Sequence, residues 1–207
     1  MDFHLPRVYP ITDARLAGIS QAEQVLRLAE GGATLVQLRE KNLSSREFFL
    51  DAEEALRVAR RRGVKIIVND RVDIALELNA DGVHLGQDDL PPEAARRLLG
   101  DEAVIGFSTH NLEQAVMAAK LPVDYLAVGP IFSTYTKRNP DPPLGLEGLR
   151  TIRAAIGGIP LVAIGGITAE NAAKVLAAGA DGVAVIGGLL SSGADIKANL
   201  ERIRRRL

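Results

Sequence analysis

Eight short apolar segments alternate with amphipathic segments along the whole chain, and this alternation constrains the fold more than any other feature. The apolar segments are rich in Val, Ile, Leu and Ala on both faces, which is typical of strands in a parallel sheet that is covered on both sides. They are residues 8–12, 35–40, 66–69, 82–85, 104–108, 125–129, 161–165 and 182–186. Strands that alternate regularly with helices predict an α/β fold with a parallel sheet.

Segments with helical periodicity follow these strands at residues 21–30, 45–62, 72–78, 92–99, 112–119, 146–155, 169–178 and 195–206. Ser44 with Glu47 has the pattern of a capping box, and Thr168, with Asn171 three residues on, is placed to cap a later helix. Eight strand–helix units of roughly 25 residues predict a (β/α)8 TIM barrel, with residues 1–207 as a single domain. The alternative is a doubly wound open sheet. We favour the barrel because no Gly-x-Gly-x-x-Gly pattern follows the first strand.

Composition and charge exclude several classes of site and partner. The chain has no cysteine, so disulfides and thiolate metal sites are excluded, and its formal net charge of −1 argues against a nucleic-acid partner. The basic run at 202–206 is interpreted as a solvated helix end. Residues 1–7 lack a signal-peptide pattern, and Asp181 and several glycines interrupt the apolar stretch at 175–190. We therefore expect a cytoplasmic protein with small-molecule substrates and no membrane partner, and we leave a homo-oligomer open.

Two aspartates follow neighbouring strands of the predicted barrel. Asp70 ends the third strand, and Asp89 lies just beyond the fourth. In such a barrel the carboxyl ends of the strands meet at one rim, where the active site is built. Two carboxylates, completed by water and phosphate oxygens, suit Mg²⁺. The alternative is that each aspartate caps the helix that follows it, and the pairing at adjacent strand ends favours the metal.

Cations follow the second and sixth strands. Arg39 and Lys41 flank Glu40 and suit a phosphate ligand, the arginine by bidentate contact and the lysine as a point charge. The alternative is a solvated loop with an internal pair between Arg39 and Glu40. Lys137 follows a threonine-rich loop and adds a third cation near a second anionic ligand.

Glycines end the seventh and eighth strands, at Gly165-Gly166 and Ile186-Gly187-Gly188. In many barrels these two loops bind phosphate through backbone N–H groups, aided by a short extra helix, for which residues 189–192 are a candidate. Simple turns are the alternative. Of the histidines, His84 lies inside a strand and is interpreted as a buried, hydrogen-bonded side chain. His110 follows a strand end and is the better acid–base candidate.

Several blocks of sequence resemble the thiamine-phosphate synthase family. They run in order along nearly the whole chain, at residues 36–41 (Val-Gln-Leu-Arg-Glu-Lys), 69–73, 82–89, 108–111, 129–137, 163–167 and 179–186. The resemblance implies a (β/α)8 enzyme that joins hydroxymethylpyrimidine diphosphate to a thiazole monophosphate and releases pyrophosphate.

The resemblance also implies roles for individual residues. Asp70 and Asp89 would hold Mg²⁺. The pyrimidine diphosphate would be bound by Gln37, Leu38, Arg39, Glu40, Lys41, Asn69, Ser108 and Lys137. The thiazole phosphate would be bound by Thr134, Thr136, Gly166 and the backbone of Ile186 and Gly187, with Tyr135 as a further substrate-binding residue.

This chemistry fits charged residues at strand ends. Breaking a benzylic-type carbon–oxygen bond needs a neutralised diphosphate leaving group, which Mg²⁺ and the cations provide electrostatically. The thiazole nitrogen is then a positioned nucleophile, and no covalent enzyme intermediate is required. We expect Ser108, Lys137 and Arg39 to be the catalytic residues.

One position departs from the family pattern, and two other functions compete. The family usually has serine where this chain has Gly187, so a hydroxyl donor to the thiazole phosphate is lost. A sister family with this fold tautomerises a thiazole carboxylate phosphate through the histidine corresponding to His110, and it resembles this chain at residues 145–148. It lacks the paired aspartates, whose presence here favours the synthase. A non-catalytic barrel that senses thiazole phosphate is disfavoured by the same two carboxylates and the three cations.

Overall fold

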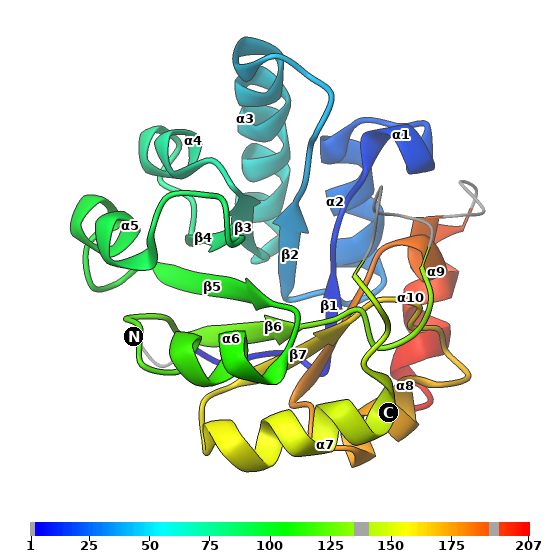
Figure 1. The fold of residues 1–207 in the computed structure, drawn as a ribbon. Helices are drawn as coiled ribbons and strands as arrows, with labels where there is room; N and C mark the ends of the chain where they lie inside the picture. The colour runs from blue at the N-terminus through cyan, green and yellow to red at the C-terminus, as the bar shows by residue number, and fades with distance from the viewer. Residues whose placement is uncertain (1–2, 135–140, 191–194) are drawn as a thin grey trace.

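An eight-stranded parallel barrel forms the centre of the molecule. The computed structural model describes residues 3–134, 141–190 and 195–207. Its strands are β1 (Val8–Pro10), β2 (Leu35–Leu38), β3 (Lys65–Asn69), β4 (Gly82–Leu85), β5 (Val104–Thr109), β6 (Tyr125–Val128), β7 (Leu161–Ile164) and β8 (Gly182–Val185). They pair in the order β1-β8-β7-β6-β5-β4-β3-β2, and all seven pairings are parallel (Figure 1).

The barrel closes between β1 and β2, just after the last residue of β1. Ile11 forms an isolated parallel bridge with Gln37. The backbone N–H of Thr12 donates to the Gln37 carbonyl at 2.9 Å, and the Arg39 N–H donates to the Thr12 hydroxyl at 3.2 Å. The predicted TIM barrel is therefore confirmed.

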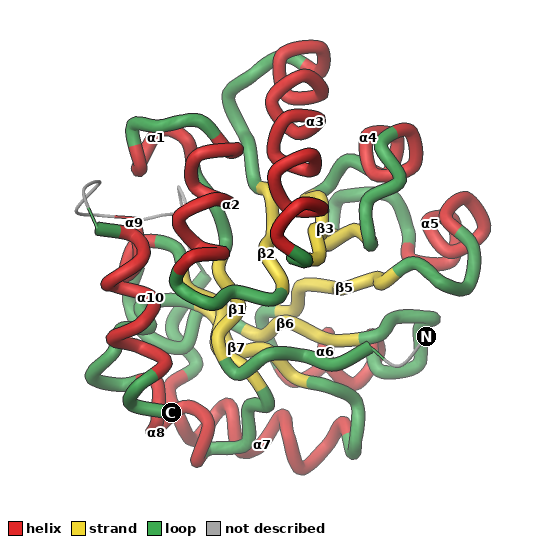
Figure 2. The backbone as a smooth tube through the Cα atoms, turned by 180° about the vertical axis from the view of Figure 1, so that it is seen from behind, coloured by secondary structure: helices red, strands yellow, loops and turns green. Residues whose placement is uncertain are grey.

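The helices surround the barrel on its outer side (Figure 2). They are α1 (Ala14–Ala17), α2 (Gln21–Glu30), α3 (Ser45–Arg62), α4 (Val72–Glu77), α5 (Pro92–Leu99), α6 (Leu112–Ala118), α7 (Gly145–Ile156), α8 (Ala172–Ala177), α9 (Gly187–Leu190) and α10 (Ile196–Arg204). The capping box of Ser44 and Glu47 is present at the start of α3. No helix in the described part of the chain is long and apolar enough to cross a membrane.

Several helix ends differ from the sequence prediction by one or two residues, and two helices differ more. The expected helix 169–178 begins only at Ala172, because the Asn171 side chain accepts from the Thr168 N–H at 2.8 Å and holds residues 168–171 as a turn. Thr168 is therefore not the cap of α8. The four-residue α1 was not predicted, and Asp13 caps it by accepting from the Leu16 N–H at 3.0 Å.

The core has two layers, as strand alternation requires for a sheet covered on both sides. The larger layer lies between the strands and the helices. The smaller layer fills the barrel and consists of Tyr9, Ile11, Leu35, Ile67, Val104, Tyr125, Ala127, Val162 and Ala184. Phe3 stacks on Tyr125 at 5.6 Å between ring centroids, at the amino end of the strands. The carboxyl ends are left for the polar residues described next.

Candidate active site

At the carboxyl end of the barrel, polar side chains occupy inward-facing positions of the strands. On β2, Leu35 belongs to the inner core, so Gln37 and Arg39 follow on the same side. On β3, Ile67 is inward, and Asn69 follows it at the strand end. The same spacing on β5 leads from the inward Val104 to Ser108 at the rim. Period-two alternation therefore brings three predicted site residues, Arg39, Asn69 and Ser108, to one end of the barrel.

Asp70 and Asp89 lie close together at this end. Burial raises the pKa of the Asp89 carboxyl, and the nearby negative charge of Asp70 raises it further. Asp70 is in the left-handed backbone region at φ 63°, which aspartate tolerates better than most residues. Its N–H donates to the His84 carbonyl at 2.8 Å, which links β3 to β4 at this point. Two carboxylates from neighbouring strands thus converge.

Neither aspartate caps a helix. The N-cap of α4 is Arg71 and that of α5 is Pro91, and neither helix has a side-chain cap bond. Asp89 instead accepts from the Gly86 N–H at 2.7 Å within its own loop. No group of three or more His, Asp or Glu side chains in the described ranges could hold a metal. A pair of carboxylates fits Mg²⁺, which takes one or two protein carboxylates and completes its shell with water and phosphate.

The cations of the β2 loop are held by acidic partners. Arg39 Nη1 lies 3.2 Å from Asp13 Oδ2, and the arginine side chain is only 18% exposed. Lys41 Nζ pairs with the Asp70 carboxylate. Glu40 does not pair with Arg39 but accepts from the backbone N–H groups of residues 41 and 42 at 2.7 and 2.6 Å. The internal Arg39–Glu40 pair of the alternative interpretation is therefore not formed, whereas the loop itself is exposed from Lys41 to Glu47.

Asn69 carries an unused buried donor. The residue is 7% exposed, and its Nδ2 has no hydrogen-bond partner within the described residues. A buried amide N–H without a partner costs free energy unless a ligand or water receives it. Asn69 sits beside His84 in the β3–β4 register and precedes Asp70 directly. The amide is therefore placed to donate to a ligand held at the two carboxylates.

Ser108 is joined to a buried histidine. Its Oγ lies 2.8 Å from His84 Nε2, and the Ser108 carbonyl accepts from Gln87 Nε2 at 2.6 Å. His84 is buried and hydrogen-bonded, as the sequence predicts. Burial lowers its pKa to about 4, so the imidazole is neutral at pH 7. At His110, Nδ1 lies 2.8 Å from the Gly129 carbonyl oxygen and 3.5 Å from Asp141 Oδ2.

On the opposite part of the rim, at the ends of β7 and β8, glycines leave mainly backbone atoms to face a ligand. Gly166 has φ +63°, and a Cβ there would lie 2.6 Å from the Ser133 carbonyl oxygen. The Ile186 carbonyl accepts from the N–H groups of Leu189 and Leu190, which begins the helix α9 at Gly187. The short helix predicted after the eighth strand is thus present, although it starts earlier than expected.

Other predicted residues fall at or beyond the described part of this rim. Thr134 is the last residue described before the gap at 135–140, and Tyr135, Thr136 and Lys137 lie in that gap, outside the described residues. Leu38 is fully buried in the outer core and contributes no side chain to the rim, so any role it has is through its backbone.

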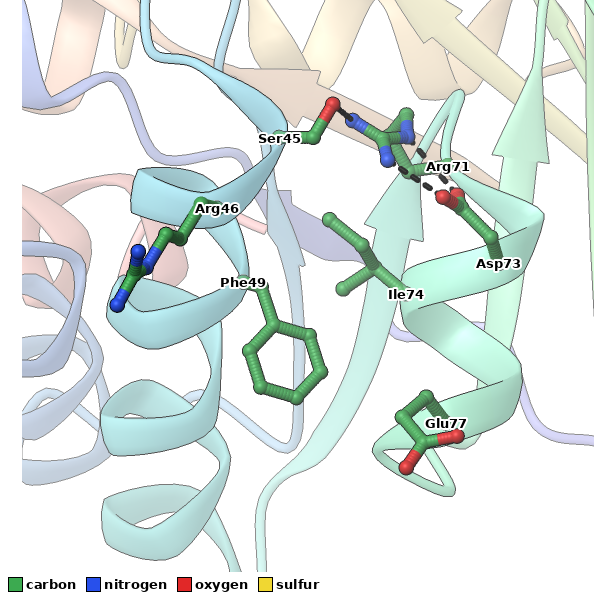
Figure 3. A pocket seen from close by; sticks show the side chains of 7 residues that line it. All are labelled: Ser45, Arg46, Phe49, Arg71, Asp73, Ile74 and Glu77. Atoms are coloured by element: carbon green, nitrogen blue, oxygen red, sulfur yellow. Dashed lines mark hydrogen bonds and ion pairs between the residues drawn. The ribbon is translucent and has the colours of Figure 1, made fainter.

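A groove between α3 and α4 adjoins the rim on the outer side of the barrel (Figure 3). The Arg71 guanidinium donates to Ser45 at 2.9 Å and to Asp73 at 2.8 Å. Figure 3 shows Arg71 spanning the starts of both helices, with Phe49 and Ile74 facing each other below it. Because Arg71 follows Asp70 directly, these bonds hold the backbone that presents Asp70.

Comparison with known proteins decides the family. The family profile described as "Thiamine monophosphate synthase" matches residues 8–189. The chain belongs to the thiamine monophosphate synthase family. It is 51% identical to the thiamine-phosphate synthase of Clostridium novyi, over 90% of this chain and 91% of the relative, and 49% identical to that of Chloroflexus aurantiacus, over 96% and 91%.

A solved structure of the family agrees with the fold. The thiamine phosphate pyrophosphorylase from Pyrococcus furiosus has a TM-score of 0.85 and 40% identity, covering 97% of this chain and 94% of its own. These comparisons confirm the family resemblance predicted from the sequence motifs, and none of them supports the tautomerase alternative. Asp13, Tyr9 and Tyr125 were not predicted as parts of the site, although all three lie on the inward side of strands or their extensions.

Proposed function

We propose that this protein is a thiamine-phosphate synthase that joins hydroxymethylpyrimidine diphosphate to hydroxyethylthiazole phosphate. The observation that carries the proposal is the convergence of the Asp70–Asp89 pair with Lys41 and Arg39 on one side of the rim. Such a cluster suits a diphosphate with its divalent cation. Family membership supports the same activity, since the relatives described above carry this name.

In the proposed reaction the thiazole ring nitrogen attacks the methylene carbon of the pyrimidine. The carbon–nitrogen bond forms, the carbon–oxygen bond to the diphosphate breaks, and its electron pair leaves with pyrophosphate. Asp70 and Asp89 are the residues that would hold Mg²⁺, which would neutralise charge on the diphosphate. Lys41 and Arg39 add fixed positive charge, and the Ser108 hydroxyl and Asn69 amide donate hydrogen bonds to the substrate.

The thiazole phosphate is assigned to the glycine side of the rim. The close packing at Gly166 leaves room only for backbone, and the chain at Ile186 and Gly187 turns its N–H groups into α9. Thr134 is assigned to the same phosphate, together with Tyr135, Thr136 and Lys137 from beyond the described part of the loop. Lys137 is further assigned, with Arg39 and Ser108, to leaving-group stabilisation.

Three broader predictions accompany this function. Residues 1–207 act as one catalytic domain, the enzyme works in the cytoplasm, and its partners are small-molecule substrates. Self-association into a homo-oligomer is left to measurement.

Incubation of the purified protein with both substrates, with and without Mg²⁺, tests the activity. Mass spectrometry and a pyrophosphate assay are expected to detect thiamine phosphate and pyrophosphate in equal amounts, and only with Mg²⁺. Conversion of a thiazole carboxylate phosphate to an isomer without Mg²⁺, with no thiamine phosphate formed, would overturn the proposal in favour of the tautomerase.

A further inference from the structure

A chain of four hydrogen bonds crosses the interior of the barrel and ends at Ser108. Gln37 Nε2 donates to the Tyr9 hydroxyl at 3.2 Å, and the Tyr9 and Tyr125 hydroxyls lie 3.0 Å apart. Tyr125 Oη is 2.9 Å from His84 Nδ1, and His84 Nε2 is 2.8 Å from Ser108 Oγ. The first four side chains are at most 6% exposed. The hydrogen-bond chain therefore links β2, β1, β6 and β4 through buried side chains and reaches the partly exposed Ser108 on β5.

The hydrogens of this chain can be assigned from its Gln37 end. With the Gln37 amide oriented as in the structure, its nitrogen faces Tyr9 and only donates, so Tyr9 accepts there and has one hydrogen to give to Tyr125. Tyr125 then gives its own hydrogen to His84 Nδ1. A neutral imidazole that accepts at Nδ1 carries its hydrogen on Nε2 and donates it to Ser108. Each hydroxyl and imidazole hydrogen between Tyr9 and His84 is then used once, and the Ser108 hydrogen is left for a ligand.

The opposite direction leaves a buried donor without a partner. If Ser108 donates to Nε2, then Nδ1–H donates to Tyr125, and Tyr125 donates to Tyr9. Tyr9 then accepts from both neighbours, and the chain offers its phenolic hydrogen no acceptor. A buried hydroxyl hydrogen without an acceptor costs about 1–3 kcal/mol. In this orientation, the Gln37 amide therefore sets the direction of the whole hydrogen-bond chain.

Charge and packing both agree with a hydrogen-bond chain that is uncharged and has fixed geometry. Gln37, Tyr9, Tyr125 and His84 are buried, and each bonds only uncharged groups along the hydrogen-bond chain, so an ionised member would place a charge in a buried site. Gly106 lies beneath the Tyr125–His84 contact: a Cβ there would meet Tyr125 Cζ at 2.1 Å and His84 Nδ1 at 2.5 Å. The backbone of β5 thus makes room for this one hydrogen bond.

We propose that Gln37, Tyr9, Tyr125 and His84 are positioning residues that hold His84 as its Nε2–H tautomer and so present the Ser108 hydroxyl as a donor to an anionic substrate oxygen. This inference rests on the proposed function, in which that oxygen belongs to the diphosphate leaving group. Charge on the leaving group grows as its bond to carbon breaks, so a preorganised donor acts mainly on kcat.

The tautomer is measured directly on the ligand-free protein, without reference to activity. Long-range ¹H–¹⁵N correlation spectra of uniformly labelled protein distinguish the two neutral imidazole tautomers, and the chain has only three histidines. His84→Gln identifies the signal by its disappearance. We expect the Nε2–H pattern for His84 at pH 7. An Nδ1–H pattern, or a protonated ring, would overturn the proposal even if thiamine phosphate is formed.

Two substitutions of His84 test the effect on Ser108. The amide of His84→Gln reaches the place of Nε2 and can still donate to Ser108, whereas the shorter amide of His84→Asn reaches only the place of Nδ1. We expect the glutamine variant to stay within about threefold of the wild-type kcat, and the asparagine variant to lose about tenfold, as for one lost hydrogen bond. Equal kcat values in the two variants would contradict the positioning role.

A double-mutant cycle separates positioning from general packing. With Ser108→Ala already present, His84→Asn should change kcat less than twofold, because the hydroxyl it orients is gone. A further loss equal to that in the wild-type background would show that His84 acts through the barrel core instead. If the wild type shows the Nε2–H tautomer but makes no thiamine phosphate, the proposed function fails while the orientation of Ser108 stands.

Discussion

The two sides of the barrel rim differ in how they are built. At the ends of β2, β3 and β4, charged side chains converge and hold one another, as in the pairs Lys41–Asp70 and Arg39–Asp13. At the ends of β7 and β8, glycine leaves only backbone, and a Cβ at Gly166 would collide with the β6 loop. The first side can neutralise a diphosphate and its cation, whereas the second can only cradle a smaller anion. This difference supports the proposal that each side of the rim binds one of the two substrates.

Removal of a carboxylate from the charged side should have the largest effect. Asp70→Asn and Asp89→Asn are each expected to lower kcat by about 100-fold or more, because the site of the cation loses one of two anionic ligands. Turnover measured across a Mg²⁺ titration checks this, and the midpoint should move to higher Mg²⁺. Full activity of either variant at limiting Mg²⁺ would remove that residue from the metal site.

His84 is neutral and buried near the charged side, and this makes the free energy of unfolding depend on pH. The pKa of His84 is about 4 in the folded protein and near the ordinary 6.5 when unfolded, so only the unfolded state gains this proton between those values. His84 alone should therefore lower the free energy of unfolding by about 3 kcal/mol as pH falls from 6.5 to 4. Urea unfolding across this range measures it, with His84→Gln as the control. A wild-type slope no steeper than that of the control would contradict the shift.

A side chain added at Gly166, on the glycine side of the rim, should disturb packing, whereas one added at Gly158, in the loop before β7, should not. Gly166→Ala places a Cβ 2.8 Å from Phe132 Cβ at φ +63°, and we expect it to cost about 1–3 kcal/mol of unfolding free energy. Gly158→Ala is the matched control, because a Cβ there meets nothing within 4 Å. Thermal and urea unfolding of both variants gives the difference. Equal stability would show that the β6 loop moves aside freely.

The smallest effect is expected at Gly187, where the family usually has serine. Gly187 is the first residue of α9 and adopts helical backbone, which serine accepts. Gly187→Ser should tighten binding of the thiazole phosphate by about three- to tenfold, less than a full charge-assisted hydrogen bond gives, because glycine leaves room for water to bind the phosphate instead. Calorimetric titration with each substrate tests this, and affinity for the diphosphate should not change. Weaker thiazole phosphate binding would mean that the added side chain obstructs the site.

Sequence reasoning predicted the barrel more completely than the site. The helices 21–30, 45–62 and 92–99 and the strand 82–85 were predicted to the residue, because each has clear periodicity and ends at glycine or a capping residue. The convergence of Asp70 and Asp89 was predictable from their places after neighbouring strands. These features are local in sequence, or follow from the one rule that parallel strands end at the same rim.

Contacts between distant strands could not be predicted in the same way. Arg39 pairs with Asp13, 26 residues away, and Asp13 sits before a helix too short to show periodicity. Alternation indicates that Tyr9, His84 and Tyr125 share the inward side, but their hydrogen bonds depend on the stagger of strands around the closed barrel. That stagger is a property of the assembled sheet and cannot be predicted from any single segment of the sequence.

A crossed kinetic measurement tests the assignment of one substrate to each side most directly. Lys41→Met removes a cation from the charged side, and Gly166→Ala fills space on the glycine side. KM for both substrates should be measured in both variants at saturating Mg²⁺. We predict that KM for the pyrimidine diphosphate rises about tenfold or more in Lys41→Met alone, and that KM for the thiazole phosphate rises in Gly166→Ala alone. The reverse pattern, or equal rises for both substrates in both variants, would contradict the account.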